Sequence, residues 1–256
     1  LNCSLNGKIH DSKIFKKIFI QPASGDSGLA LGGLYLGIQD KLNSKFNLVK
    51  KYNNYLGSEF TNKEIVNVLK STKVKYKKFL NIYKPTSKLI KEGKIIAWFQ
   101  GSSEFGPRAL GNRSILCKPY PSSMKDYLNK RVKFREYFRP FAPAVLEEKY
   151  KKYFDLRQES PHMLIACKAK KDKIKEIPAV VHVDNSCRVQ TVSKETNFRF
   201  YNLIKEFYNI TKIPVLLNTS FNVKGQPMVN TPLQAINTFK STNIDILVIG
   251  DYIVTK

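Results

Sequence analysis

Gly101-Ser102-Ser103-Glu104-Phe105-Gly106-Pro107-Arg108-Ala109-Leu110-Gly111-Asn112-Arg113-Ser114-Ile115 is the most informative stretch of this 256-residue chain. It follows Ile95–Gln100, an apolar run that predicts a buried strand. Its glycines let backbone N–H groups approach an anion closely, and Arg108 and Arg113 add two charges. The Gly-Lys-Ser/Thr ending of a Walker loop is absent. The stretch predicts an anion-binding loop; the alternative is a tight loop whose arginines pair with surface carboxylates.

The basic residues of the chain are unevenly distributed. The formal net charge is +24, and 36 of the 44 basic residues are Lys. An AT-rich genome favours Lys in any protein, so this excess alone does not indicate nucleic acid. All eight Arg lie between Arg108 and Arg199, and five of them lie within Arg108–Arg139. Because the guanidinium fork suits carboxylate and phosphate, we expect the Arg positions to mark an anionic ligand.

A second basic stretch is Asn129–Pro143, which has five cations within ten residues, interleaved with three aromatic residues. Prolines after Arg139 restrict the backbone and so direct these side chains. One interpretation is a surface for single-stranded nucleic acid, and another is a site for a small, highly anionic ligand such as a nucleoside triphosphate. A solvated charged helix end fits poorly, because Arg139 stands between Phe138 and Pro140.

A third polar stretch, Leu216–Gly225, places hydroxyl and amide side chains at the mouth of the predicted strand Pro214–Leu217. Such groups are typical of a loop that faces a ligand. They are also common in turns, where they bond to the local backbone. The residues alone leave both interpretations open.

The apolar patterning predicts a mixed α/β protein. A capping box at Thr61 predicts a helix to about Lys70. Residues 43–60 are polar, as in a linker or surface loop. Further helices are expected at Leu29–Ile38 (closely packed), from Thr86 to Gly93, from Ser122 or Ser123 to Arg131, at Phe198–Tyr208, and from Thr231-Pro232 to Lys240. Further strands are expected at Lys17–Ile20, His162–Cys167, Ala179–Val183, Arg188–Val192 and Pro214–Leu217, with a final hairpin at Ile244–Ile249 and Tyr252–Val254.

Several classes of protein do not fit the composition. The four cysteines form no CxxC pair, so neither a zinc site nor a disulfide framework is expected. No apolar run approaches the roughly 18 residues of a membrane span, and residues 1–20 lack the charged-then-apolar layout that predicts a secretory leader. We therefore expect a cytoplasmic protein without a membrane partner. The first residue, Leu1, lies in a stretch patterned like a protein interior, and we expect a further segment upstream of it.

Four stretches together resemble a known family: Gly101–Ile115, Lys133–Val145, Pro178–Val192 and Pro214–Thr231 are similar to the C-terminal domain of the carbamoyltransferases. The family includes nodulation-factor, cephamycin and aminoglycoside O-carbamoyltransferases. The run from Glu104 to Ile115 is long and specific, and the resemblance covers nearly the whole chain.

The resemblance implies a fold and a division into domains. Residues 86–256 resemble a YrdC-like domain, a twisted open α/β sheet with flanking helices that is shared with threonylcarbamoyl-adenylate synthases. Residues 1–45 resemble the end of an actin-like carbamoyl-transfer domain. Residues 46–85 are expected to be a linker with a short helix.

The resemblance also implies a reaction and its residues. The YrdC-like domain would use ATP and carbamoyl phosphate to form carbamoyl adenylate, and the actin-like domain would transfer the carbamoyl group to an acceptor hydroxyl. Fixed cations would stabilise the charge that develops. Phosphate and carbamoyl groups would be held by Arg108, Arg113, Lys133, Arg139 and Arg188, and the nucleotide by Ser220 and Asn222. His182 is a candidate to help open carbamoyl phosphate; a structural hydrogen bond is the commoner role of a strand histidine.

Asp26 matches the last metal-ligand position of the family, in Gly25-Asp26-Ser27-Gly28. A divalent metal, Fe or Mg, is expected only in a full-length protein, because one carboxylate cannot hold a metal and His10, His162 and His182 are too scattered to replace the missing ligands. The expected partners are small molecules: ATP, carbamoyl phosphate and a hydroxyl acceptor such as a sugar. Neither the acceptor nor the oligomeric state can be deduced from the sequence.

Two alternatives remain beside the enzyme. One is a basic nucleic-acid-binding module of the kind found in tRNA-modifying enzymes, although nucleic acid is not the partner we expect. The other is a domain that binds a ligand without catalysis. Phosphate-backbone binding would weaken steeply with salt, whereas adenylation would depend on carbamoyl phosphate.

Overall fold

The computed structural model describes residues 1–42 and 53–256. Eight strands form one mixed sheet in the order β1-β10-β9-β2-β3-β8-β4-β7, and a second, two-stranded sheet is β5-β6. The strands are β1 Lys75–Lys78, β2 Ile96–Phe99, β3 Arg113–Cys117, β4 Ala142–Leu146, β5 Ala166–Lys168, β6 Ser186–Arg188, β7 Gln190–Val192, β8 Val215–Ser220, β9 Ile246–Ile249 and β10 Tyr252–Thr255. The predicted mixed α/β class is confirmed.

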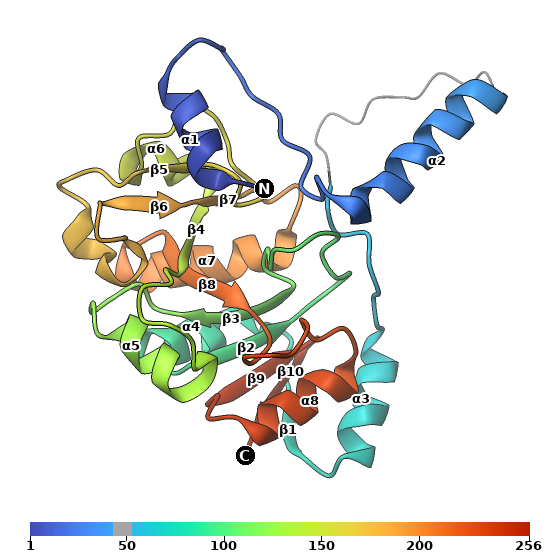
Figure 1. The fold of residues 1–256 in the computed structure, drawn as a ribbon. Helices are drawn as coiled ribbons and strands as arrows, with labels where there is room; N and C mark the ends of the chain where they lie inside the picture. The colour runs from blue at the N-terminus through green and yellow to red at the C-terminus, as the bar shows by residue number, and fades with distance from the viewer. Residues whose placement is uncertain (43–52) are drawn as a thin grey trace.

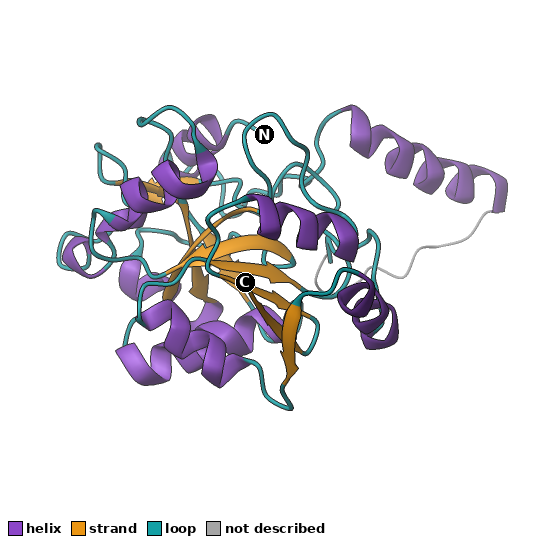
Figure 2. Cartoon of the chain, turned by 90° about the horizontal axis from the view of Figure 1, so that it is seen from below, coloured by secondary structure: helices purple, strands orange, loops and turns teal. Residues whose placement is uncertain are grey.

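Helices cover both faces of the large sheet, as the view from below in Figure 2 shows. In β2 the side chains alternate: Ala97 and Phe99 pack with α3, α5, η1 and α8, while Ile96 and Trp98 pack with α4 and α7. The helices are α1 Cys3–Asp11, α2 Asp26–Leu42, α3 Asn62–Ser71, α4 Tyr83–Lys91, α5 Met124–Leu128, α6 Tyr150–Tyr153, α7 Phe198–Thr211 and α8 Pro232–Ser241, with the π-helix η1 Asn129–Lys133 and the 3₁₀ turns η2 Glu147–Lys149, η3 Ile174–Glu176 and η4 Pro178–Val180.

The loops that contain the three polar stretches lie at one edge of the large sheet. Strand β2 pairs antiparallel with β3, β3 with β8, and β8 with β4, whereas β4 and β7 are parallel. Strands β2 and β8 therefore end at the edge where β3, β4 and β7 begin. We call it the loop edge. The three polar stretches of the sequence meet there because they follow β2, precede β4 and follow β8.

The N-terminal segment has two helices with different surroundings. Helix α1 lies against β5 so closely that a Cβ on Gly7 would sit 2.2 Å from the carbonyl oxygen of Ala166. Helix α2 extends away from the rest of the chain (Figure 1). Its Leu29 is 71% exposed and its Leu36 62% exposed, so the prediction that Leu29–Ile38 is a closely packed helix is right about the helix and wrong about the packing.

Four strand predictions need correction. Lys17–Ile20 is extended but forms no ladder, because the backbone of Ile18 bonds to the Gln158 side chain at 3.0 and 2.8 Å. Ala179–Val183 begins as a 3₁₀ turn at Pro178 and continues into a turn. His162–Cys167 contributes only its end to β5, and Arg188–Val192 divides between β6 and β7, which belong to different sheets.

The region expected to be a linker, 46–85, belongs largely to the main fold. Strand β1 pairs with β10, and the buried Ile65 and Leu69 of α3 join the core. The predicted capping box at Thr61 is confirmed, whereas α4 begins at Tyr83 and encloses Thr86. The predicted boundary at 45–46, and residues 43–52 of the predicted loop, lie outside the described residues. No helix of the described chain is long and apolar enough to cross a membrane.

Candidate active site at the loop edge

Three arginines from separate segments lie close together at the loop edge. Arg188 is the last residue of β6, Arg108 lies in the 101–112 loop, and Arg135 follows η1. Burial, followed by the nearby charges of Arg108 and Arg135, lowers the pKa of Arg188 to about 10. Like charges repel, so this cluster favours an anion between them. We call Arg108, Arg135 and Arg188 the cation cluster.

Some hydrogen-bond donors of the cation cluster have no acceptor within the described residues. Within residues 1–42 and 53–256, the Nε atoms of Arg108, Arg135 and Arg188 are buried and have no hydrogen-bond partner, and the same is true of His182 Nε2. Buried polar atoms are nearly always paired in folded proteins, so each exception needs a reason. A phosphate-bearing ligand would supply the missing acceptors for the arginines.

Arg135 was not among the residues predicted for the site. Its guanidinium lies 4.4 Å from the centre of the Phe141 ring, and its Nη2 donates to the Pro140 carbonyl at 3.1 Å. Burial, and then the charge of Arg139, lower the pKa of Arg135. The available signal was its place among the few Arg of a Lys-rich chain.

Lys133, Ser220 and Asn222, three of the residues predicted for the site, contact one another. The η1 turn ends at the buried Lys133, and Phe134 follows in the left-handed region at φ 45°. Lys133 Nζ donates to the carbonyl of Ser220 (3.0 Å) and to the carbonyl and Oδ1 of Asn222 (2.9 and 2.8 Å), with Ser220 Oγ at 3.3 Å. An ammonium has three N–H groups, so a phosphate must displace one of these oxygens to bind Lys133.

Lys133 should make stability depend on pH. Burial, followed by the charge of Arg135, lowers its pKa from 10.5 to about 7. Between these values the unfolded chain binds more protons than the folded one, so the free energy of unfolding rises with pH, by up to about 1.4 kcal/mol per pH unit. We expect Lys133→Met to lose this rise, measured by urea unfolding at about pH 7.5 and 9.5. An identical pH dependence in both proteins would contradict the assignment.

Arg113 supports the loop from inside the protein. It is fully buried, its guanidinium carbon lies 3.7 Å from the centre of the Phe99 ring, and burial lowers its pKa to about 10. Its Nη1 donates to the carbonyls of Gln100, Gly101 and Asn112 (2.7, 3.1 and 3.0 Å), and its Nη2 to that of Ser58 (2.9 Å). Arg113 Nε has no partner within the described residues, but Nη1 and Nη2 already bind the backbone, so Arg113 is not part of the site proposed below.

Two other residues explain the shape of the 101–112 loop. Glu104 is 6% exposed, and its Oε1 accepts from the backbone N–H groups of Leu110, Asn112 and Arg113 at 2.7, 2.8 and 3.2 Å. Gly111 has φ 104°, and a Cβ there would lie 2.1 Å from the Phe200 ring. The loop therefore requires a carboxylate and a glycine at these positions to present Arg108.

Arg139 lies on the rim and does not join the buried cluster. Its Nε donates to Glu136 at 2.8 Å, and 55% of its side chain is exposed. Its charge nevertheless lowers the pKa of Arg135, which places it within electrostatic reach of the cluster. Its predicted role in holding a substrate group stays a prediction.

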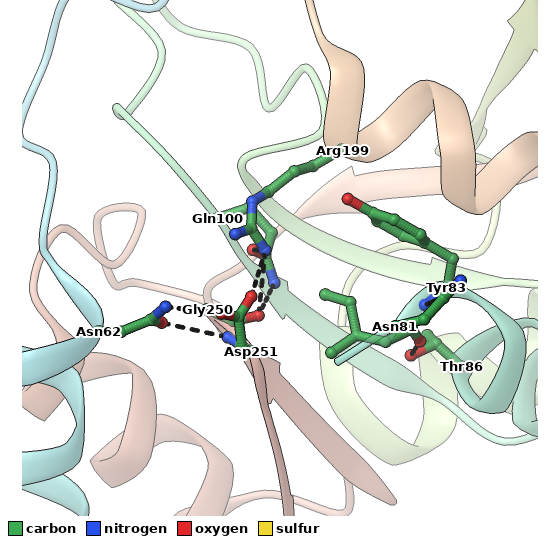
Figure 3. Close-up of polar contacts among 9 residues, drawn as sticks. Asn62, Asn81, Tyr83, Thr86, Gln100, Arg199, Gly250 and Asp251 are labelled. Carbon is green, nitrogen blue, oxygen red and sulfur yellow. Dashed lines mark hydrogen bonds and ion pairs between the residues drawn. The ribbon is translucent and has the colours of Figure 1, made fainter. Parts of the chain in front are cut away.

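The guanidinium of Arg199 is held by hydrogen bonds to other residues of the fold. In Figure 3 it reaches from α7 toward Gln100, Gly250 and Asp251. Its Nη1 donates to Asp251 Oδ1 at 2.9 Å and to Gln100 Oε1 at 3.1 Å, and Asn62 Nδ2 donates to the other Asp251 oxygen at 2.6 Å. This network ties α7 and α3 to the β9–β10 hairpin and is separate from the cation cluster.

The predicted metal ligand Asp26 is the first residue of α2. Across residues 1–42 and 53–256 there is no group of three or more His, Cys, Asp or Glu that would hold a metal ion. The described donors therefore do not fit a metal site, and we derive no chemical step from a metal. A metal bound through Asp26 stays a prediction for a full-length protein.

Fold and site together define a mixed α/β domain that gathers guanidinium groups at one sheet edge. The model of the family "Carbamoyltransferase C-terminus" matches residues 87–256. The chain belongs to this family, and the resemblance stated above is confirmed.

Relatives of known sequence agree with this assignment. The chain is 40% identical over 261 residues to nodulation protein NolNO of Sinorhizobium fredii, covering 100% of this chain and 38% of that protein. It is 33% identical over 251 residues to the 3'-hydroxymethylcephem-O-carbamoyltransferase of Streptomyces clavuligerus, covering 98% and 46%. The chain thus spans less than half of the length of these curated relatives.

A solved structure of full-length HypF in the phosphate- and nucleotide-bound form aligns with 68% of this chain and 24% of that chain. The TM-score is 0.45 and the sequence identity 20%.

Proposed function

We propose that this chain carries the carbamoyl-activating half of an ATP-dependent O-carbamoyltransferase. In this proposal the cation cluster holds the phosphates of carbamoyl phosphate and ATP, and the product is carbamoyl adenylate. The observation that carries it is that the buried Nε atoms of Arg108, Arg135 and Arg188 lack partners within the described residues. The Nε of Arg113 also lacks one, but the other donors of Arg113 bind backbone carbonyls. Membership of the carbamoyltransferase family supports the choice of substrates.

The reaction balances with one water molecule. Attack of water on the carbonyl carbon of carbamoyl phosphate breaks the bond to the bridging oxygen and releases phosphate and carbamate. A carbamate oxygen then attacks the α-phosphorus of ATP, and the bond to the β-phosphate bridging oxygen breaks, releasing pyrophosphate. Negative charge grows on both leaving groups, and fixed guanidinium groups stabilise it without reorganising.

Residues in and around the cluster would bind different parts of the substrates. Arg108 and Arg188 would bind phosphate oxygens, and Arg135 would extend the positive surface toward Lys133, whose pKa it lowers. Ser220 and Asn222 would contact the nucleotide once Lys133 releases one of their oxygens. The acceptor hydroxyl, the transfer step and a metal at Asp26 would require parts of a longer protein, as in the relatives.

The proposal predicts that the chain catalyses exchange of labelled pyrophosphate into ATP only when carbamoyl phosphate is present. The expected dependence is absolute, because pyrophosphate can re-form ATP only from an adenylate. The assay should be repeated with acetyl phosphate and with no acyl phosphate as controls.

Two results would count against the proposal. Exchange without carbamoyl phosphate would point to another adenylation. No exchange, combined with tight binding of a single-stranded oligonucleotide that weakens steeply with salt, would favour the nucleic-acid alternative.

A further inference from the structure

A chain of hydrogen bonds leads from Asp184 to His182. Asp184 Oδ1 accepts from the hydroxyl of Ser186 at 2.7 Å and from the backbone N–H of Ser186 at 3.0 Å. The same hydroxyl oxygen lies 2.9 Å from His182 Nδ1. Lys168 Nζ donates to the backbone carbonyl of Asp184 at 2.7 Å and lies 3.5 Å from the second carboxylate oxygen, Oδ2.

The backbone holds this arrangement in a tight turn. His182 donates its N–H to the Ser186 carbonyl, and Asn185 donates to the His182 carbonyl, both at 2.9 Å. Asn185 adopts φ 63°, a left-handed conformation that asparagine tolerates. The turn follows the 3₁₀ turn that replaces the strand expected at Ala179–Val183, and it brings the backbone of His182 to Ser186, the first residue of β6.

The donors and acceptors fix the tautomer of His182. The hydrogen bonds of Ser186 keep the pKa of Asp184 at about 2, so its carboxylate is ionised and only accepts. The Ser186 hydroxyl must donate to it, and its oxygen must then accept from His182. Burial lowers the pKa of His182, so the ring is neutral at pH 7 and its single proton sits on Nδ1.

His182 Nε2 therefore carries a lone pair that can accept a hydrogen bond. This nitrogen is buried and has no partner within residues 1–42 and 53–256. It lies within electrostatic reach of the cation cluster. Residues two apart on a strand share a face, so Ser186 and Arg188 lie on one side of β6. The charge of Arg188 also lowers the pKa of His182. A ligand that contacts both side chains must bring an anion for Arg188 and an N–H or O–H donor for His182.

We propose that His182, held in the Nδ1–H tautomer by Ser186 and Asp184, selects a carbamoyl group by accepting a hydrogen bond from its NH₂. This rests on the proposed function and adds a specificity-determining residue and two positioning residues to it. An acyl phosphate that carries CH₃ in place of NH₂ has the same shape and charge but leaves the buried Nε2 unsatisfied. Sites that bond a substrate N–H reject analogues that lack it for this reason.

The test uses two stable phosphonates that do not hydrolyse. Phosphonoacetamide carries the carbamoyl NH₂, and 2-oxopropylphosphonate carries CH₃ instead. Titration calorimetry of the full chain should give an affinity on the order of tenfold higher for the amide. In His182→Leu and Ser186→Ala the ratio should fall toward one, while inorganic phosphate should bind equally to all three proteins.

A second measurement reads the tautomer directly and needs no activity. Long-range ¹H–¹⁵N correlation spectra of the three histidines at about pH 8 should show His182 with a protonated Nδ1 and a bare Nε2. The signal is assigned by its loss in His182→Leu. In Ser186→Ala the Nε2–H form should appear, because the acceptor for Nδ1–H is gone; a residue with only a packing role would not shift it.

The outcomes separate the two proposals. Equal affinity for both phosphonates in the native chain, or a proton on Nε2 there, would overturn the inference about His182 and leave the anion site standing. Failure of inorganic phosphate and of both phosphonates to bind would overturn the proposed function, and this inference with it.

Discussion

Arg188→Met is expected to slow carbamoyl-phosphate-dependent pyrophosphate exchange by about a hundredfold, close to 3 kcal/mol of transition-state stabilisation. Its buried guanidinium sits beside Arg108 and Arg135, and its Nε has no acceptor within the described chain. Methionine keeps much of the length of the side chain and removes the charge. The fold should not suffer, because the change also removes repulsion among like charges; we expect the free energy of unfolding to stay the same or rise.

Arg131→Met is the matched control for that experiment. Arg131 belongs to the same basic stretch, but it lies 3.5 Å from Asp245 and stacks 5.0 Å from the centre of the Tyr127 ring. It should retain activity within about twofold, as expected for a partly exposed ion pair. Equal losses in the two variants would mean that total charge, and not the position of Arg188, controls the rate.

Arg113→Met is expected to lose stability and not ligand binding, the reverse of Arg188→Met. The expected loss is about 4 kcal/mol in the free energy of unfolding. The change leaves the carbonyls of Gln100, Gly101, Asn112 and Ser58 without a shared charged donor, and it removes the stacking on Phe99. Urea unfolding followed by circular dichroism measures the loss. At low urea, the folded fraction should still bind inorganic phosphate within about threefold of the native chain.

Arg113→Lys keeps the positive charge and removes the guanidinium geometry. A single ammonium cannot reach all the carbonyls that Nη1 and Nη2 bind, so most of the destabilisation should remain. A variant that folds with native stability and yet loses phosphate binding would show that Arg113 acts on the ligand, as the sequence resemblance implied.

The sequence predicted best what short-range chemistry determines. The Thr61 capping box, the helix that begins at Thr231-Pro232, the strand around Ile96–Phe99 and the final hairpin are all present, because each depends on neighbouring residues. Glu104–Ile115 also identified the family correctly. Strands β1, β3 and β4 were not predicted, because their pairing partners lie far away in the chain.

The roles of individual arginines were beyond the reach of the sequence. Arg108 and Arg113 look equivalent in a glycine-rich stretch, yet Arg113 begins β3 and turns inward to backbone carbonyls. Arg135 and Arg139 also look alike, and only Arg135 is partly buried against Phe141 and neighbouring cations. Burial and the distance to carbonyl oxygens separate a fold-supporting arginine from one available to a ligand, and both require the folded chain.

A crystal structure of the chain soaked with phosphonoacetamide tests the central claim most directly. We predict phosphonate oxygens within hydrogen-bond distance of the guanidinium groups of both Arg108 and Arg188. Density for the ligand elsewhere, with these two guanidinium groups paired to protein oxygens, would contradict the claim.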